Sequence, residues 1–146
     1  MAETITLPAS AKQLLFGVNF LGIFLFLLFT FSGFSKLSAF GGLLHNLHHD
    51  QIHLFRLFLT PLHLDRLGMD AISLRVLVAM TEILMGTFLL TPRALVPAAV
   101  LGGLQVGFIY CLVYMGYPGQ MVGLHAFLLA GLVAFATFRV RLGRMA

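Results

Sequence analysis

The chain has 146 residues, of which 60% are hydrophobic and only 10% are charged, and its mean hydropathy is +1.00. Soluble domains carry about 45–50% apolar and about 25% charged residues, so this composition predicts an integral membrane protein. The net charge of +4 does not indicate nucleic-acid binding, because the basic residues are scattered around apolar segments and form no continuous basic face. The single cysteine, Cys111, excludes an intrachain disulfide and paired-thiol redox chemistry.

The first predicted transmembrane helix covers about residues 14–35, where the run from Leu14 to Phe34 is long and apolar enough to cross a bilayer. This run is longer than the core of a signal peptide, and no convincing A-x-A cleavage site follows it. We therefore expect the helix to be retained. At its far end, Lys36 is expected to extend its side chain outward to the headgroup region.

The next segment, at about 43–59, predicts an amphipathic helix that lies in the plane of the headgroups. Its apolar residues at helical spacing are Leu44, Leu47, Leu54, Phe55 and Phe58, and its histidines on the other side are His45, His49 and His53, with His48 beside them. Histidines spaced four residues apart on a helix can share a metal ion, but only Asp50 is near enough to complete the set. We predict a solvated polar face and no metal.

The second predicted span, at about 74–91, holds one carboxylate, Glu82, near its middle. A charge inside such a segment is costly unless it is paired, protonated or hydrated, so Glu82 is expected to face other helices and not lipid. Two interpretations of Glu82 stay open. It is either a buried acid that only joins helices, or a functional group.

The third and fourth predicted spans, at about 96–115 and 121–138, are joined by a tight turn with the sequence GYPGQ. Small residues recur along one face of each span, and small residues let two membrane helices approach closely. They are Gly103 and Gly107 on the third span, and Ala126, Ala130 and Ala134 on the fourth. We expect the two spans to pack together through these faces.

The distribution of basic residues predicts that both termini face the cytoplasm. The residues that carry this signal are Lys12, Arg93, Arg139, Arg141 and Arg144. Together the segments predict an all-α membrane protein with a single domain, 1–146. Its expected architecture is a four-helix transmembrane bundle with an amphipathic helix between spans one and two.

Given this topology, several polar groups are expected to form one cluster in the outer half of the bundle. They are Ser32, Ser35, Lys36, Arg75, Glu82 and His125, with Gln105 near the middle of the membrane. Seven residues separate Arg75 from Glu82, which is about 10 Å along a helix. The expected partner of Glu82 is therefore Gln105 or His125.

The cluster has two open interpretations. It fits a small polar cavity for a ligand, a quinone head or a partner's transmembrane helix, and it also fits a satisfied structural network. A haem between spans is not expected, because only His125 lies clearly inside one.

Two segments resemble a known family. FSGFSKL at Phe31–Leu37 and TEILMGTFLL in span two resemble the DoxX-like four-helix membrane proteins, which carry a G-x-x-K-type end to the first helix and an E-x-x-x-G in the second. Within that superfamily, Leu59–Gly86 is most similar to the NACHO branch, the novel acetylcholine receptor chaperones. The matching positions are Pro61, Leu67-Gly68, Leu74-Arg75, Glu82, Gly86 and His125-Ala126, within a resemblance that runs from about Phe31 to Arg141.

The resemblance implies an endoplasmic-reticulum membrane chaperone that helps subunits of ligand-gated channels of the nicotinic acetylcholine receptor type to fold and assemble. It implies no catalysis and no cofactor. The expected partners are membrane lipid and transmembrane helices of the client subunits, with a homo-oligomer also open. The alternative is a small membrane subunit of a quinone-linked oxidoreductase, as for some bacterial DoxX-like members, which would place the chain in a plasma membrane. A third is a structural or cargo-binding protein with no ligand.

Overall fold

The computed structural model describes residues 9–37 and 45–145. This part of the chain is helical throughout and contains no strand. The elements are α1 (Ala9–Leu37), α2 (His45–Phe58), the 3-10 helix η2 (Asp65–Leu67), α3 (Ala71–Phe88), α4 (Leu95–Tyr114) and α5 (Gly119–Met145).

Helices α1, α3, α4 and α5 are long and apolar enough to cross a membrane, so the chain is an integral membrane protein. The predicted fold class is confirmed. Helix α4 begins and ends within one residue of the predicted third span, α3 begins and ends three residues earlier than the predicted second span, and α1 begins at Ala9, five residues before the predicted start of the first. The fourth span was expected to end at about residue 138, but α5 continues to Met145 and carries Arg144 in its last turn. Cationic side chains at a helix C-terminus interact favourably with the helix dipole, which supports this extension.

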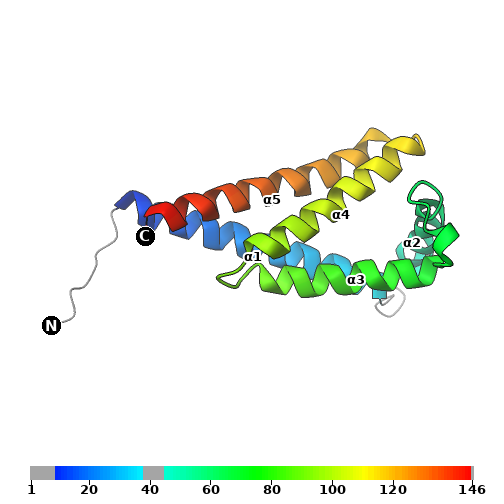
Figure 1. The fold of residues 1–146 in the computed structure, drawn as a ribbon, viewed down its shortest axis with the longest axis horizontal. Helices are drawn as coiled ribbons and strands as arrows, with labels where there is room; N and C mark the ends of the chain where they lie inside the picture. The colour runs from blue at the N-terminus through cyan, green and yellow to red at the C-terminus, as the bar shows by residue number, and fades with distance from the viewer. Residues whose placement is uncertain (1–8, 38–44, 146) are drawn as a thin grey trace.

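The four spans form a ring in which each helix packs against two others. Helix α1 contacts α3 and α5, and α4 contacts α5 and α3. Successive spans run in opposite directions, so α1 begins and α5 ends at the same end of the bundle (Figure 1). Helix α2 lies at the opposite end, where it packs against α3. The predicted amphipathic helix at 43–59 is therefore present as α2, while residues 43 and 44 lie outside the described part.

Local turn and capping signals precede α3 and mark its start. Gly68 adopts the left-handed conformation, with φ of 73°, and its N–H bonds to the carbonyl of Asp65 to close η2. Asp70 then caps α3, because its side-chain oxygen accepts a hydrogen bond from the Ser73 N–H at 2.6 Å. The connection from α2 to the next span is therefore residues 59–70.

The interior of the bundle consists of two apolar clusters. The first, toward the chain termini, is formed by Val18, Leu25, Phe29, Leu89, Ala94, Ala98, Leu101, Leu132 and Phe135. The second, toward α2, is formed by Phe55, Phe58, Ala71, Leu74, Val78, Phe108, Cys111 and Leu112. On α4, buried Gln105 lies between Leu101 of the first cluster and Phe108 of the second. A polar layer therefore separates the two apolar cores.

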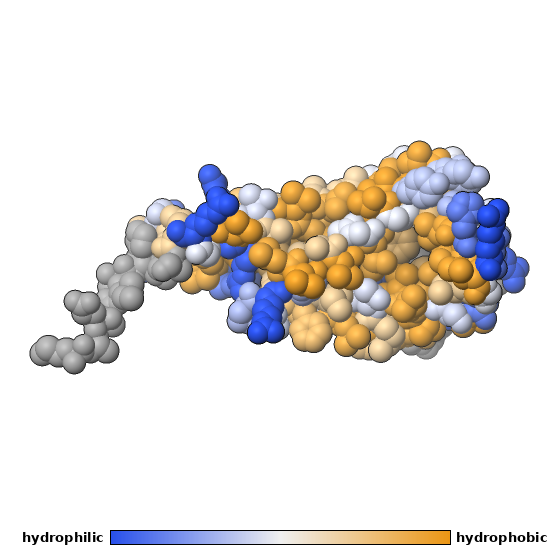
Figure 2. Space-filling model, viewed as in Figure 1, coloured by the Kyte–Doolittle hydropathy of each residue, from blue (hydrophilic) through white to orange (hydrophobic). Residues whose placement is uncertain are grey.

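The outer surface is also apolar. Many large hydrophobic side chains are exposed, including Phe16, Phe20 and Phe31 on α1. Figure 2 shows a broad hydrophobic region along the length of the molecule with hydrophilic residues gathered toward its two ends. Such a surface is stable against lipid tails, and its hydrophilic ends suit the two headgroup regions.

Helices α4 and α5 pack together as expected, but not through the predicted small-residue faces. A Cβ added at Gly103 or Gly107 would meet nothing within 4 Å, and Ala126 and Ala130 are exposed. The reason lies in Gln105, which is buried. Gly103 is two residues away, about 200° around the helix, and so points outward when Gln105 points inward.

Candidate functional site

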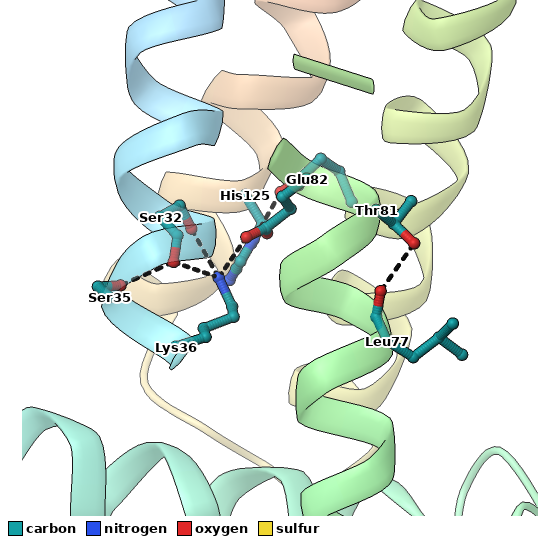
Figure 3. Close-up of polar contacts among 8 residues, drawn as sticks. Ser32, Ser35, Lys36, Leu77, Thr81, Glu82 and His125 are labelled. Carbon is teal, nitrogen blue, oxygen red and sulfur yellow. Dashed lines mark hydrogen bonds and ion pairs between the residues drawn. The ribbon is translucent and has the colours of Figure 1, made fainter. Parts of the chain in front are cut away.

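The polar layer is built around an ion pair between the end of α1 and the middle of α3. The Nζ atom of Lys36 lies 2.6 Å from Oε2 of Glu82, and the two side chains are only 9% and 2% exposed. Figure 3 shows Lys36 reaching from α1 toward Glu82, with His125 of α5 close to both. Each charge compensates the other, which is the arrangement that a buried charge needs at this depth.

Lys36 also donates hydrogen bonds to Ser32 of its own helix. An ammonium group has three N–H donors, and Lys36 Nζ donates to Glu82 Oε2, to Ser32 Oγ at 2.6 Å and to the Ser32 carbonyl at 3.3 Å. Ser35 donates its hydroxyl to the same Ser32 carbonyl at 2.7 Å. The three donors of Lys36 therefore all have acceptors, which fixes the position of the charge.

This geometry corrects two expectations. Lys36 does not extend outward to the headgroups, because a carboxylate on the neighbouring helix is within reach and compensates its charge more directly. For the same reason, the hydrogen-bonding partner of Glu82 is Lys36 and neither Gln105 nor His125. One signal in the sequence points to the pair, namely that a lysine directly follows the first apolar run and a carboxylate of opposite charge lies within the second.

Two glycines let α1 and α3 approach closely enough to form the pair. A Cβ on Gly33 would lie 2.6 Å from Ile83 Cγ1 and 2.7 Å from the Ala79 carbonyl oxygen, and one on Gly86 would lie 3.2 Å from Phe29 Cβ. These glycines sit three residues before Lys36 and four residues after Glu82. The close-packing role expected of Gly103 and Gly107 therefore belongs to Gly33 and Gly86.

A second buried pair joins α4 to α5. Gln105 Oε1 and His125 Nδ1 are 2.6 Å apart, and Gln105 is 1% exposed. The His125 ring also packs on Phe108, with ring centroids 4.9 Å apart. Since the side-chain oxygen of Gln105 is an acceptor, His125 donates through a protonated Nδ1. His125 also lies close to the Lys36–Glu82 pair (Figure 3), so the two pairs form one polar layer.

Arg75 belongs to the same helix as Glu82 but lies nearer to α2. It is buried in the second turn of α3. The structure therefore brings together Ser32, Ser35, Lys36, Glu82, Gln105 and His125 in one layer, with Arg75 beyond it toward α2.

The histidines proposed as weak metal candidates are only partly described. His53 is exposed on α2, while the side chains of His45 and His49 lie outside the described part. Within the residues that the structure describes, there is no group of three histidine, cysteine or carboxylate side chains placed to hold a metal ion.

Gly103 and Gly107 do not lie in a contact between two helices. They face outward and line an open groove. The groove has a volume of ≈ 340 Å³ and is bordered by Phe55 and Phe58 of α2, Val78 of α3 and Phe108 of α4. Neither glycine has a neighbouring atom within 4 Å of a built Cβ. The backbone of α4 is therefore accessible from the lipid side along this groove.

No protein-family model matches the chain, and a search of curated proteins gives no significant match. The fold and the polar layer define a four-helix integral membrane protein with a buried ion pair between its first and second spans.

Proposed function

We propose that this protein is a membrane-embedded assembly chaperone that binds a transmembrane helix of a client protein. The observation that carries the proposal is the groove beside Gly103 and Gly107. It opens between α3 and α4, has aromatic walls, and includes two glycines one helical turn apart at which an added Cβ would meet nothing within 4 Å.

The physics of helix association in lipid favours this use of the groove. Apolar side chains gain little by leaving lipid for one another, so membrane helices associate mainly through close packing and hydrogen bonds. Glycines spaced by four residues allow a second helix to approach the backbone closely. Helix α2 lies at one end of the bundle (Figure 1) and contributes Phe55 and Phe58 to the lining of the groove. A client helix would therefore meet a groove lined in part by aromatic side chains.

The resemblance to the DoxX-like family suggests the class of client. FSGFSKL contributes Gly33 and Lys36, and TEILMGTFLL contributes Glu82 and Gly86. These two segments contact each other through the ion pair and through Gly33, so the resembling residues form one structural unit. On this basis we propose that the clients are subunits of ligand-gated channels of the nicotinic acetylcholine receptor type, and that the protein acts in the endoplasmic reticulum.

The proposal is tested by coexpressing the protein with such channel subunits and measuring how many assembled channels reach the cell surface. Gly103→Leu or Gly107→Leu fills the groove, and we expect surface delivery to fall to the level of cells without the protein. Gly123→Leu is the matched control. Gly123 is also exposed, with nothing within 4 Å, but it lies on α5, and its substitution should leave delivery unchanged.

Size-exclusion chromatography of each purified variant separates the possible causes of a loss. A monodisperse Gly103→Leu variant that no longer supports delivery locates the client contact in the groove. If Gly103→Leu instead converts an oligomer into a monomer, the groove joins two copies of this chain and the client assignment is wrong. Unchanged delivery by both groove variants would also contradict the proposal.

A second candidate function is a small membrane subunit of a quinone-linked oxidoreductase. The observation in its favour is the Gln105–His125 pair, a hydrogen-bonded amide and imidazole in the polar layer near the middle of the bundle. A quinone carbonyl accepts hydrogen bonds, and the side-chain NH₂ group of Gln105 can donate them while His125 holds the Gln105 oxygen. This candidate predicts that a quinone co-purifies with the protein and is lost in Gln105→Leu, whereas the chaperone proposal predicts no such dependence.

A further inference from the structure

The end of the bundle that holds both termini is basic. Five cationic residues lie there, on α1, on the turn between α3 and α4, and on α5: Lys12, Arg93, Arg139, Arg141 and Arg144. Among the described residues, the carboxylates lie elsewhere. Asp50, Asp65 and Asp70 are in or beside α2 and η2 at the other end, and Glu82 is in the polar layer.

An apolar groove opens beside the turn between α3 and α4 at this basic end. It has a volume of ≈ 510 Å³. Its walls are formed by Met85 and Phe88 of α3 and by Val96 and Pro97 of α4, and its charged lining residue is Arg93. The groove therefore combines an apolar wall along two spans with a guanidinium group at the level where the bundle leaves the membrane.

A second arginine lies close to the same groove. Arg139 of α5 donates a hydrogen bond from its guanidinium to the Thr91 carbonyl at 3.2 Å, and Thr91 lines the Arg93 groove. Arg139 also lines a neighbouring hollow of ≈ 310 Å³ whose walls include Leu90 and Phe135. Two cationic groups, Arg93 of the turn and Arg139 of α5, thus lie beside Thr91.

We propose that this groove binds an anionic phospholipid, with one acyl chain along the apolar wall and the phosphate on Arg93. The pairing follows from chemistry, because a guanidinium matches a phosphate with two parallel hydrogen bonds. It also follows from position, because the groove lies along two spans and its arginine is in the turn where they end, as expected for a group at the headgroups. Arg139 adds a second positive charge close to the headgroup and fixes the Thr91 carbonyl.

The apolar wall makes a lipid the expected ligand and not a free phosphate. A free anion would gain only the arginine contacts, whereas a lipid also fills the groove. A zwitterionic lipid fills the groove equally well but carries a positive group that Arg93 repels. The site should therefore select lipids that combine an acyl chain with a net negative headgroup.

Native mass spectrometry of the detergent-purified protein tests this proposal. The protein is mixed with equal amounts of phosphatidylglycerol and phosphatidylcholine that carry identical acyl chains, and the bound lipids are counted. We expect phosphatidylglycerol to be retained in preference. Arg93→Ala should reduce that preference about fivefold, which corresponds to the loss of one basic residue at a membrane surface. Arg93→Lys keeps the charge and should lose less.

Arg66→Ala is the matched control, because Arg66 is an exposed arginine of η2 at the opposite end of the molecule. If Arg66→Ala lowers the preference for phosphatidylglycerol as much as Arg93→Ala does, the preference depends only on the net charge of the protein, and the proposed site is wrong. An unchanged preference in Arg93→Ala would also overturn it. Displacement of phosphatidylglycerol by an equal concentration of glycerophosphoglycerol, which has no acyl chains, would contradict the assignment to lipid.

Discussion

Lys36 and Glu82 are 46 residues apart in the sequence, yet their charged atoms are 2.6 Å apart in the fold. The pair joins the last turn of α1 to the middle of α3, and both of its side chains are buried. It lies near Gly33 and Gly86, where an added Cβ would be close to atoms of the neighbouring helix. The pair and the two glycines therefore fix how α1 and α3 align along the membrane normal.

The ion pair should behave as one energetic unit. Glu82→Leu leaves the Lys36 ammonium buried without a carboxylate, and breaking a buried pair in this way costs about 3–5 kcal/mol of unfolding free energy. Glu82→Gln keeps an oxygen acceptor of similar shape and should cost less. The double variant Lys36→Met with Glu82→Leu removes both charges and should recover at least half of the loss.

The measurement is a double-mutant cycle on the free energy of unfolding in mixed detergent micelles. Lys36→Met alone supplies the missing corner of the cycle. If the losses of the two single variants add in the double variant, the two residues are not coupled and the pair does not hold α1 against α3.

Gly33 should be intolerant of any side chain. Even the single carbon of Gly33→Ala would lie 2.6 Å from Ile83 and 2.7 Å from the backbone oxygen of Ala79, so α1 and α3 must separate. Overpacking of this kind costs about 1–3 kcal/mol, and the thermal midpoint should fall accordingly. Gly17→Ala is the control, since Gly17 is in the same helix with nothing within 4 Å. Equal midpoints for the two variants would mean that the helices do not pack here.

The cap of α3 should make the stability of the fold depend on pH. The Ser73 N–H donates to Asp70 and lowers the pKa of that carboxyl. A carboxyl whose pKa is depressed by folding stabilises the fold above its unfolded pKa, and this contribution is lost as the pH falls through the folded value. We therefore expect the cap to stabilise the fold fully above about pH 4 and to weaken below it.

Thermal midpoints of three proteins between about pH 3 and about pH 7 test the cap. Asp70→Ala should be less stable at neutral pH and should approach the original protein in acid. Asp70→Asn keeps a capping oxygen that does not titrate, so its midpoint should lack the acid-dependent decrease. A midpoint difference between Asp70→Ala and the original protein that stays constant over this range would assign the effect to something other than the carboxylate.

The arrangement of the spans predicts that both ends of the chain lie on one side of the membrane (Figure 1). By the charge rule this is the cytoplasmic side, because that end carries the arginines of α5 and of the turn between α3 and α4. Cysteines introduced at Ser10 and at Gly143, in a Cys111→Ala background, should both resist an impermeant thiol reagent added from outside. A cysteine at Arg66 should react. Reaction at only one terminal site would require an odd number of crossings.

The sequence predicts the architecture well because the signals for it are local. Runs of about 20 apolar residues identify the spans, and Gly68 and Gly116 mark turns at which the chain takes the positive φ angles that the structure contains. The histidine and phenylalanine pattern of α2 likewise predicts an amphipathic helix that the structure contains. Each of these signals depends on neighbours only a few residues away.

The partners within the bundle could not be predicted in the same way, because pairing depends on how each helix is rotated. A glycine stripe looks the same whether it faces another span or the lipid. In α4 the rotation is set by burial of Gln105, which turns Gly103 and Gly107 outward. Lys36 of α1 pairs with Glu82 because α3 packs beside α1. The sequence of α1 alone does not show which helix will be its neighbour.

The separation of Lys36 from Glu82 has a consequence for biosynthesis. Ribosomes add about 5–20 residues per second, so Lys36 is made roughly 2–9 seconds before its partner. During that interval α1 carries an ammonium with no carboxylate to neutralise it. Lys36 lies in the last turn of α1, where a long side chain can reach the headgroups until α3 arrives. Docking of α3 is then the step that moves this charge from the aqueous boundary into the bundle, so a delay in inserting α3 leaves the nascent first span with its lysine still at the surface.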